Sequence, residues 1–325
     1  MQSSNDEITK PLHLAGGLQV VTPTPQIFAL SDFTGSILIA RQPRRCCWDF
    51  DGSQVATEHI HARFQRLALE RRIRQRLHEP EWRTLGSCFG GQEILAFRQV
   101  LHRIRHQQDN LPPELIALFE GVEPEELVAL KKQILSEHLE ELARTGESGD
   151  FEVVDGFLPL MAHLHALGFE STTVTNTDST NLGHFFKIFG LDSFHAHRVT
   201  GDQIPPGYGK PHGKPFRMAC EKMGADLPGL CFENTAEGVI SAWRAGGRVL
   251  LCATDRRLST ELSRLADMIE QGAHLSRDAD GMKKRTYFEI IYMPAESWMP
   301  LVERLRVEHP IPDADPDTVT AGASA

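Results

Sequence analysis

The chain has 325 residues, more than one typical domain, because single hydrophobic cores usually stop growing near about 250 to 300 residues. Its composition, 41% hydrophobic and 24% charged, is that of an average soluble globular chain, which excludes a disordered or fibrous protein as a global description. A formal net charge of -10 argues against a protein whose main task is to grip nucleic acid backbones. We therefore expect two domains, or one domain with a large insertion, and small or metal-bridged ligands.

Neither a membrane span nor an export signal is predicted. No stretch approaches the roughly 18 apolar residues that a membrane span needs, and the first ten residues are polar and acidic rather than basic. The six cysteines form no Cys-x-x-Cys pair, and reduced, buried thiols suit the cytoplasm. We expect a soluble cytoplasmic protein without membrane partners; its oligomeric state is left open.

The N-terminal region is predicted to be a small β-rich extension over residues 1–44. Short β-like runs at 18–21, 26–30 and 36–40 are separated by Pro and Gly. The apolar run 45–50 follows and ends in acidic residues. This pattern indicates a buried strand whose carboxyl end carries polar groups.

Residues 57–150 are predicted to form an all-helical block. Apolar residues recur three and four positions apart within 59–78, 91–106 and 123–144, which is the spacing of one helix face. The arginine-rich first of these helices would also suit a nucleic-acid surface, but a solvated face is the commoner role of such runs.

After residue 150 the pattern alternates between helix and strand. Helices are predicted at 156–167, 178–189, 215–223 and 236–245, with strands at 171–176, 196–199, 230–234 and 248–253. A further helix, a strand at 287–292, a helix near 296–307 and a Pro/Asp/Ala-rich end over 310–325, typical of disorder, complete the chain. Such alternation predicts a Rossmann-like, doubly wound parallel α/β sheet. Its core would comprise 45–56 and 151–309, with the helical block of 57–150 inserted.

Polar side chains gather where four of the predicted strands end or a helix begins. They lie in Asp49-Phe-Asp-Gly-Ser53, Val174-Thr-Asn176, Gly209-Lys-Pro211 and Phe232-Glu-Asn234. Ligands of an open parallel sheet bind beyond the carboxyl ends of its strands. Carboxylates suit Mg²⁺, whereas lysine, hydroxyl and backbone N–H groups suit phosphate oxygens.

Together these motifs resemble those of the haloacid dehalogenase superfamily. Asp49-Phe-Asp-Gly-Ser53 matches the first motif of that superfamily, Thr175-Asn176 the second, Lys210 the third and Glu233-Asn234 the fourth. The resemblance spans about residues 45–255, with all four motifs in order. The helical block corresponds to a C1-type cap, as in β-phosphoglucomutase-like and phosphoglycolate-phosphatase-like members.

The resemblance implies a phosphatase that works through an aspartyl-phosphate intermediate. Asp49 would be the nucleophile and Asp51 the acid and base, while Thr175 and Lys210 would complete the catalytic set. Lys214, in the same Gly-Lys-Pro-His-Gly-Lys-Pro stretch, competes with Lys210 but stands at the start of the next helix.

The resemblance also implies a metal and a substrate site. Mg²⁺ would be held by Asp49, Asp51, Glu233 and Asn234. Substrate-binding residues are expected in three places: Gly52 and Ser53, Asn176, and Gly86 and Ser87 in the cap loop 84–92. Glycines in that loop would allow a close backbone approach to substrate, although they equally suit an ordinary interhelical turn.

One position departs from the family pattern. The fourth motif usually offers two acids, but its second member here is Asn234. An amide oxygen can ligate Mg²⁺ but brings no charge, so weaker metal binding is expected.

Our leading hypothesis is thus a Mg²⁺-dependent phosphatase for a small phosphorylated metabolite. A β-phosphoglucomutase-like phosphotransferase and a catalytically weakened phosphate-binding or regulatory protein stay open. Dehalogenase or phosphonatase chemistry is less favoured, because Asp51 suits phosphate esters and no cap lysine stands out as a Schiff-base former.

Overall fold

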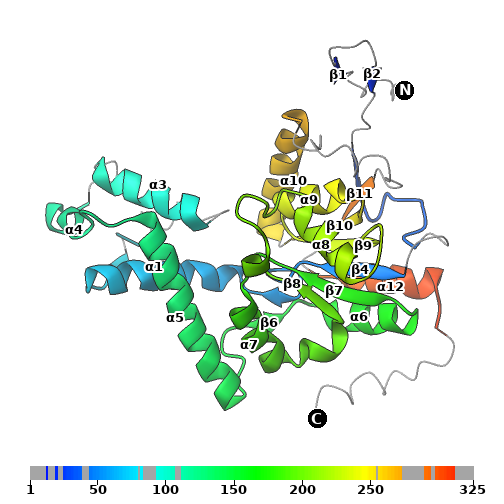
Figure 1. Ribbon diagram of the computed structural model, residues 1–325, viewed down its shortest axis with the longest axis horizontal. Helices are drawn as coiled ribbons and strands as arrows, with labels where there is room; N and C mark the ends of the chain where they lie inside the picture. The colour runs from blue at the N-terminus through cyan, green and yellow to red at the C-terminus, as the bar shows by residue number, and fades with distance from the viewer. Residues whose placement is uncertain are drawn as a thin grey trace. The chain divides into compact units, whose positions relative to one another are not determined.

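A computed structural model describes residues 12–13, 19–20, 25–38, 44–79, 81–82, 93–106, 111–253, 255–272, 289–293 and 297–311. The chain divides into two compact units (Figure 1). The first comprises Met1–Ala56, Val153–Ser179 and Gly190–Ala325, and the second Thr57–Glu152 and Thr180–Phe189. Two predicted substrate-binding residues, Gly86 and Ser87, lie outside the described residues. No helix in the described ranges is long and apolar enough to cross a membrane.

The first unit is built on a seven-stranded sheet in which every neighbouring pair is parallel. The strand order is β3-β11-β10-β9-β4-β7-β8. The strands are β3 (Gln26–Ala29), β4 (Arg45–Trp48), β7 (Glu170–Val174), β8 (His197–Val199), β9 (Leu230–Glu233), β10 (Arg248–Cys252) and β11 (Glu289–Met293). This arrangement confirms the predicted doubly wound parallel α/β fold.

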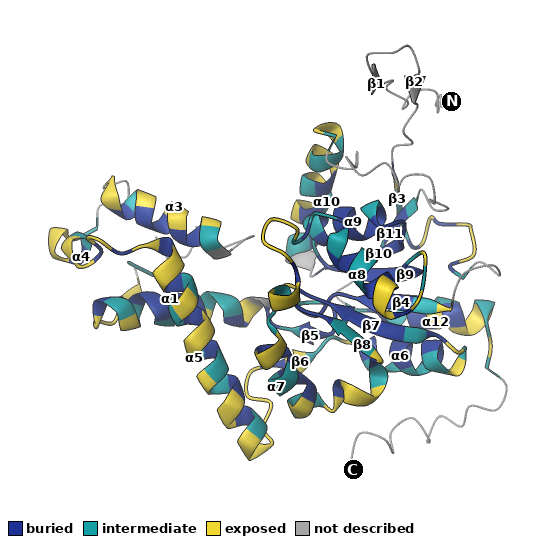
Figure 2. Ribbon diagram, in the orientation of Figure 1, coloured by how far each residue is buried: buried dark blue, intermediate teal, exposed yellow. Residues whose placement is uncertain are grey.

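Helices cover both faces of this sheet. Helices α6 (Phe157–Ala166) and α12 (Met299–Glu308) pack together on one face, and α8 (Lys214–Lys222) and α9 (Ala236–Arg244) lie on the other (Figure 1). Helix α10 (Asp255–Glu270) packs against α9. Every residue of β9 and β10 is buried (Figure 2). Burial on both faces explains why these strands are apolar without alternation.

The strand order reverses between β4 and β9. From β4 the sheet extends through β7 to β8, and from β9 it extends in the opposite direction through β10 to β11. Such a switch point leaves a crevice beyond the carboxyl ends of the two strands. The first motif follows β4 and the fourth begins at the last residue of β9, so both lie at the carboxyl edge of the sheet where the strand order reverses.

The N-terminal segment contributes more to the first unit than the sequence indicated. Strand β3 pairs with β11 and becomes the edge strand of the main sheet. The described part of the expected strand at 36–40 is not a strand. Its carbonyls are instead held by the buried Arg248, which donates to Ser36 O at 2.7 Å and Ile37 O at 2.8 Å.

We expect Arg248→Met to destabilise the first unit by about 1–3 kcal/mol, because two carbonyls lose a charged donor. Guanidinium denaturation measures this loss. The matched control is Arg306→Met, which removes an exposed arginine of α12 and should change stability little. Equal midpoints for the two variants would show that the clamp on residues 36–37 contributes nothing.

The second unit is helical. It contains α1 (Glu58–Ile73), α3 (Glu93–Arg105), α4 (Pro113–Leu118), α5 (Pro124–Thr145) and nearly all of α7 (Ser179–Phe189). Helix α1 packs on α5, and α5 on α3, around a buried apolar cluster. The helix expected at 59–78 ends at Ile73, because Arg74 adopts a left-handed conformation with φ 55°. The short helix α4 was not predicted.

Two short strand pairs and two 3-10 helices complete the described structure. The pairs are β1 (Leu12–His13) with β2 (Gln19–Val20), and β5 (Val55–Ala56) with β6 (Glu152–Val153). The 3-10 helices are η1 (Leu191–Phe194) and η2 (Gly201–Gln203).

Candidate active site

The two acids of the first motif follow β4 directly. Trp48, the last residue of β4, stacks on Phe232 of β9 with ring centroids 3.7 Å apart, and Asp49 N donates to Phe232 O at 2.9 Å. These contacts fix where the strand ends. The chain then turns at Gly52, whose φ of 79° is rarely adopted by residues with a side chain. Asp49 and Asp51 therefore both lie at the carboxyl end of β4.

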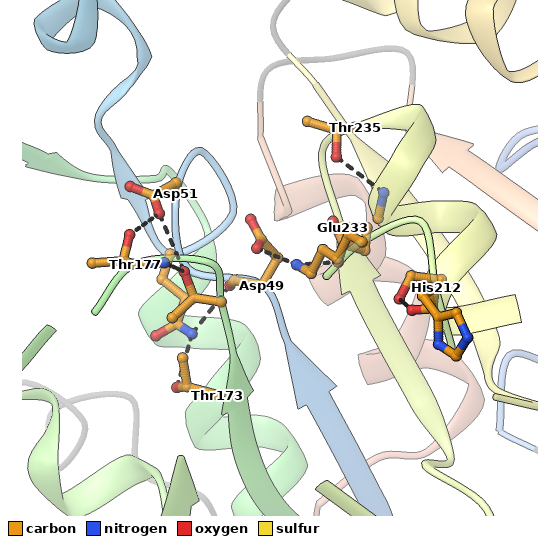
Figure 3. A network of polar contacts seen from close by, with 12 residues as sticks. Asp49, Asp51, Thr173, Thr177, His212, Glu233 and Thr235 are labelled. Atoms are coloured by element: carbon orange, nitrogen blue, oxygen red, sulfur yellow. Dashed lines mark hydrogen bonds and ion pairs between the residues drawn. The ribbon is translucent and has the colours of Figure 1, made fainter. Parts of the chain in front are cut away.

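Lys210 joins the first motif to the fourth. Its Nζ lies 2.5 Å from Asp49 Oδ1 and 2.6 Å from Glu233 Oε1. Figure 3 shows Asp49 and Glu233 facing each other from neighbouring strands. Lys214, the alternative weighed from the sequence, instead lies 3.4 Å from Glu221 on its own helix. The structure thus brings Lys210, and not Lys214, to the two acids.

Glu233 can occupy this position because Gly238, in the first turn of α9, has no side chain. A Cβ atom at Gly238 would lie only 1.9 Å from Glu233 Oε2, so any larger residue there would displace the carboxylate. Thr235 caps the helix by accepting a hydrogen bond from Gly238 N at 3.2 Å (Figure 3). The first turn of α9 therefore leaves space for the Glu233 carboxylate.

Burial governs the charges of this cluster. It raises the pKa of the Asp49 carboxyl above its ordinary value, and Lys210 opposes that rise. The pKa of Glu233 is raised for the same reason. Burial acts to lower the pKa of Lys210, but the charges of Asp49 and Glu233 outweigh it and the pKa is raised. The lysine is consequently a fixed positive charge shared by two carboxylates.

Asp51 is held by two threonines that follow β7. Its Oδ2 accepts hydrogen bonds from Thr177 Oγ1 at 2.6 Å and Thr175 Oγ1 at 3.3 Å. Thr177 N in turn donates to Thr175 Oγ1 at 3.0 Å. Asp51 and Thr177 lie to one side of Asp49 in Figure 3. Thr177 was missed in the sequence, although two threonines separated by one residue after a strand could have signalled it.

The other predicted site residues lie at different depths. Ser53 is fully buried, and its carbonyl accepts a hydrogen bond from Trp298 Nε1 at 2.8 Å. Asn176 is exposed, and a Cβ at Gly209 would lie 3.6 Å from its Oδ1. Asn234 is buried. Asn176 thus borders the loop that carries Lys210, whereas the Ser53 side chain belongs to the interior.

The donors available for a metal ion are all oxygens. The carboxyl oxygens of Asp49, Asp51 and Glu233 lie here together with the ammonium of Lys210. Within the described ranges no three His, Cys, Asp or Glu side chains are arranged to hold a metal by themselves. Amide or backbone carbonyl oxygens, such as those of Asn234 and Asp51, would have to complete the set. Oxygen donors of this kind fit Mg²⁺.

Comparison with known proteins identifies the family. The haloacid dehalogenase-like hydrolase family matches residues 43–247, more than half of the chain. The chain belongs to this family, as its four motifs predicted. No curated protein matches the chain.

Several solved structures are similar to this chain. CbbY from Rhodobacter sphaeroides, solved in complex with phosphate, is 18% identical with a TM-score of 0.48, over 65% of this chain and 86% of that chain. A predicted phosphoglycolate phosphatase from Haemophilus somnus is 18% identical with a TM-score of 0.48, over 66% and 86%. A family IA haloacid dehalogenase hydrolase from Entamoeba histolytica is 19% identical with a TM-score of 0.46, over 70% and 99%.

Proposed function

We propose that the protein is a Mg²⁺-dependent phosphatase that hydrolyses a small phosphorylated metabolite through an aspartyl-phosphate intermediate. The main observation in its support is that Lys210 is shared by Asp49 and Glu233, while two threonines orient Asp51. Family membership makes a hydrolase the expected activity. The arrangement supplies one carboxylate for attack and a second carboxyl for proton transfer.

In the proposed first step, a carboxylate oxygen of Asp49 attacks phosphorus and the ester P–O bond breaks. Asp51 gives its proton to the leaving oxygen. In the second step Asp51 takes a proton from water, which attacks the phosphoryl group and releases inorganic phosphate from Asp49. Lys210 and the Thr175 hydroxyl would bind the phosphoryl oxygens.

Asp49, the Asp51 carbonyl, Glu233 and Asn234 are the residues that would hold Mg²⁺. When bound, the ion would neutralise charge on the phosphoryl group. We assign substrate selection to the helical unit, including Gly86 and Ser87. This unit would act as a cap that excludes water.

The direct test is release of inorganic phosphate from an aryl phosphate and from a panel of phosphorylated metabolites, with and without Mg²⁺. Metal-dependent release that differs strongly between metabolites would support the proposal. One alternative, a catalytically weakened phosphate-binding protein, is favoured by Asn234, because this residue brings no charge to the metal site. Saturable phosphate binding without any turnover would establish that alternative instead.

We expect Asn234→Asp to tighten Mg²⁺ binding by about 10- to 100-fold, because one negative charge is restored near the cation. The Mg²⁺ midpoint of activity and a direct binding titration both measure the change. The matched comparison is Glu233→Gln, which removes a charge next to Asn234. An unchanged midpoint in Asn234→Asp with a lost midpoint in Glu233→Gln would show that Asn234 is not a ligand.

A further inference from the structure

A fully buried amide lies in the turn that carries the two acids of the first motif. Gln54 N donates to Phe50 O at 3.0 Å, and Gln54 O accepts from Val154 N at 2.9 Å. The side chain of Gln54 reaches back along the same turn, where its Nε2 lies 3.1 Å from Asp49 O. Gln54 therefore ties the end of the turn to the carbonyl of the residue placed as nucleophile.

The amide continues into a chain of buried polar groups. Its Nε2 also donates to Thr173 Oγ1 at 3.2 Å on β7 (Figure 3). Its Oε1 lies 3.0 Å from His195 Nε2, and His195 Nδ1 lies 2.8 Å from Ser171 Oγ. The chain thus links the carboxyl end of β4 to two residues of β7 and to the segment that precedes β8.

The direction of every bond in this chain can be deduced. A carbonyl can only accept, so the Gln54 atom beside Asp49 O must be the amide nitrogen, and its two hydrogens go to Asp49 O and Thr173 Oγ1. Gln54 Oε1 is then an acceptor, so His195 Nε2 must carry the hydrogen and donate it to Gln54 Oε1. In neutral imidazole Nδ1 is left as the acceptor for the Ser171 hydroxyl.

His195 is suited to be a fixed donor. It is buried, and burial lowers its pKa to about 3, so it stays neutral at physiological pH. Its ring lies over Phe157 with centroids 6.4 Å apart. A single tautomer of the imidazole is therefore held in place by Ser171, Gln54 and an aromatic neighbour.

We propose that Gln54 and His195 are positioning residues that fix the peptide after Asp49 and thereby the orientation of Asp49 relative to Asp51. This inference rests on the proposed function, in which those two carboxyl groups must act on one phosphoryl group from defined directions. A misplacement of about 1 Å in such an arrangement can cost on the order of 100-fold in rate. Neither residue needs to touch substrate.

The test uses two substitutions of His195 that separate its two contacts. In His195→Gln the side-chain nitrogen can take the place of Nε2 and still donate to Gln54. In His195→Asn the shorter amide can keep the contact with Ser171 but not the one with Gln54. We expect kcat to fall by about 10- to 100-fold in His195→Asn and in Gln54→Leu, with KM unchanged, and kcat to stay close to wild type in His195→Gln.

A second readout does not need turnover. Beryllium fluoride, supplied with Mg²⁺, forms an adduct on a well-placed aspartate that mimics its phosphoryl form, and fluorine NMR measures its affinity. We expect this affinity to follow kcat across the variants. The control is His163→Asn, which removes a buried imidazole of α6 outside the network and should leave kcat per folded molecule unchanged.

Equal kcat and equal adduct affinity in the two His195 variants, with an active wild type, would overturn the inference, because the donor to Gln54 would then not matter. This comparison stands even where Gln54→Leu fails to fold. A wild-type protein that forms neither product nor adduct would instead overturn the proposed function itself, and the inference with it.

Discussion

Replacing Asp49 with asparagine is expected to abolish turnover while leaving the fold intact. The amide has nearly the volume of the carboxylate but cannot attack phosphorus, and loss of a nucleophile costs roughly 10⁶-fold in kcat in a well-studied hydrolase. Phosphate monoesters are among the slowest molecules to hydrolyse unaided, so background reaction should not hide the loss. Phosphate release from an aryl phosphate measures the effect.

The control for this variant is Asp267→Asn, which changes an exposed acid of α10 and should keep full activity. Circular dichroism and thermal unfolding of both variants establish that each is folded. Turnover by Asp49→Asn within about tenfold of wild type would contradict the covalent mechanism.

The main sheet and the cluster of motifs were predictable because they depend on local order. Each strand of a doubly wound sheet is an apolar run followed by a helix, and polar residues after such a run must lie at the carboxyl edge. Asp49, Thr175 and Glu233 were located in this way. The pattern places them at one edge without showing their contacts, so the sharing of Lys210 by two acids required the structure.

Other features depend on pairings between distant parts of the chain. Strand β3 joins the sheet beside β11, more than 250 residues further along, and nothing in its local pattern indicates that neighbour. Gln54 occupies a turn and His195 a loop, where a buried polar role cannot be distinguished from an exposed one. Their network forms only because β7 brings Ser171 and Thr173 beside both. The sequence therefore revealed the acids, Thr175 and Lys210, but not the network of Gln54 and His195.

The Gly-Lys-Pro repeat, which runs from the loop before α8 into the first residues of α8, offers a natural comparison and leads to the second large expected effect. Lys210 is buried between Asp49 and Glu233, whereas Lys214 is partly exposed and pairs with Glu221 on its own helix. Removing one partner of a buried ion pair costs about 3–5 kcal/mol, because the remaining charge is left uncompensated. An exposed pair contributes about 0–1 kcal/mol.

Lys210→Met should accordingly lower the free energy of unfolding by about 3–5 kcal/mol and abolish turnover, whereas Lys214→Met should change stability by no more than about 1 kcal/mol. Guanidinium denaturation and phosphate release measure the two effects separately.

Adding Glu233→Gln to Lys210→Met should restore part of the stability, since one of the two uncompensated acids is neutralised, but none of the activity. If Lys210→Met were no less stable than Lys214→Met, the acids would not depend on this lysine in the folded protein. If the double variant were less stable than Lys210→Met alone, repulsion between Asp49 and Glu233 would be excluded as the cause of the loss.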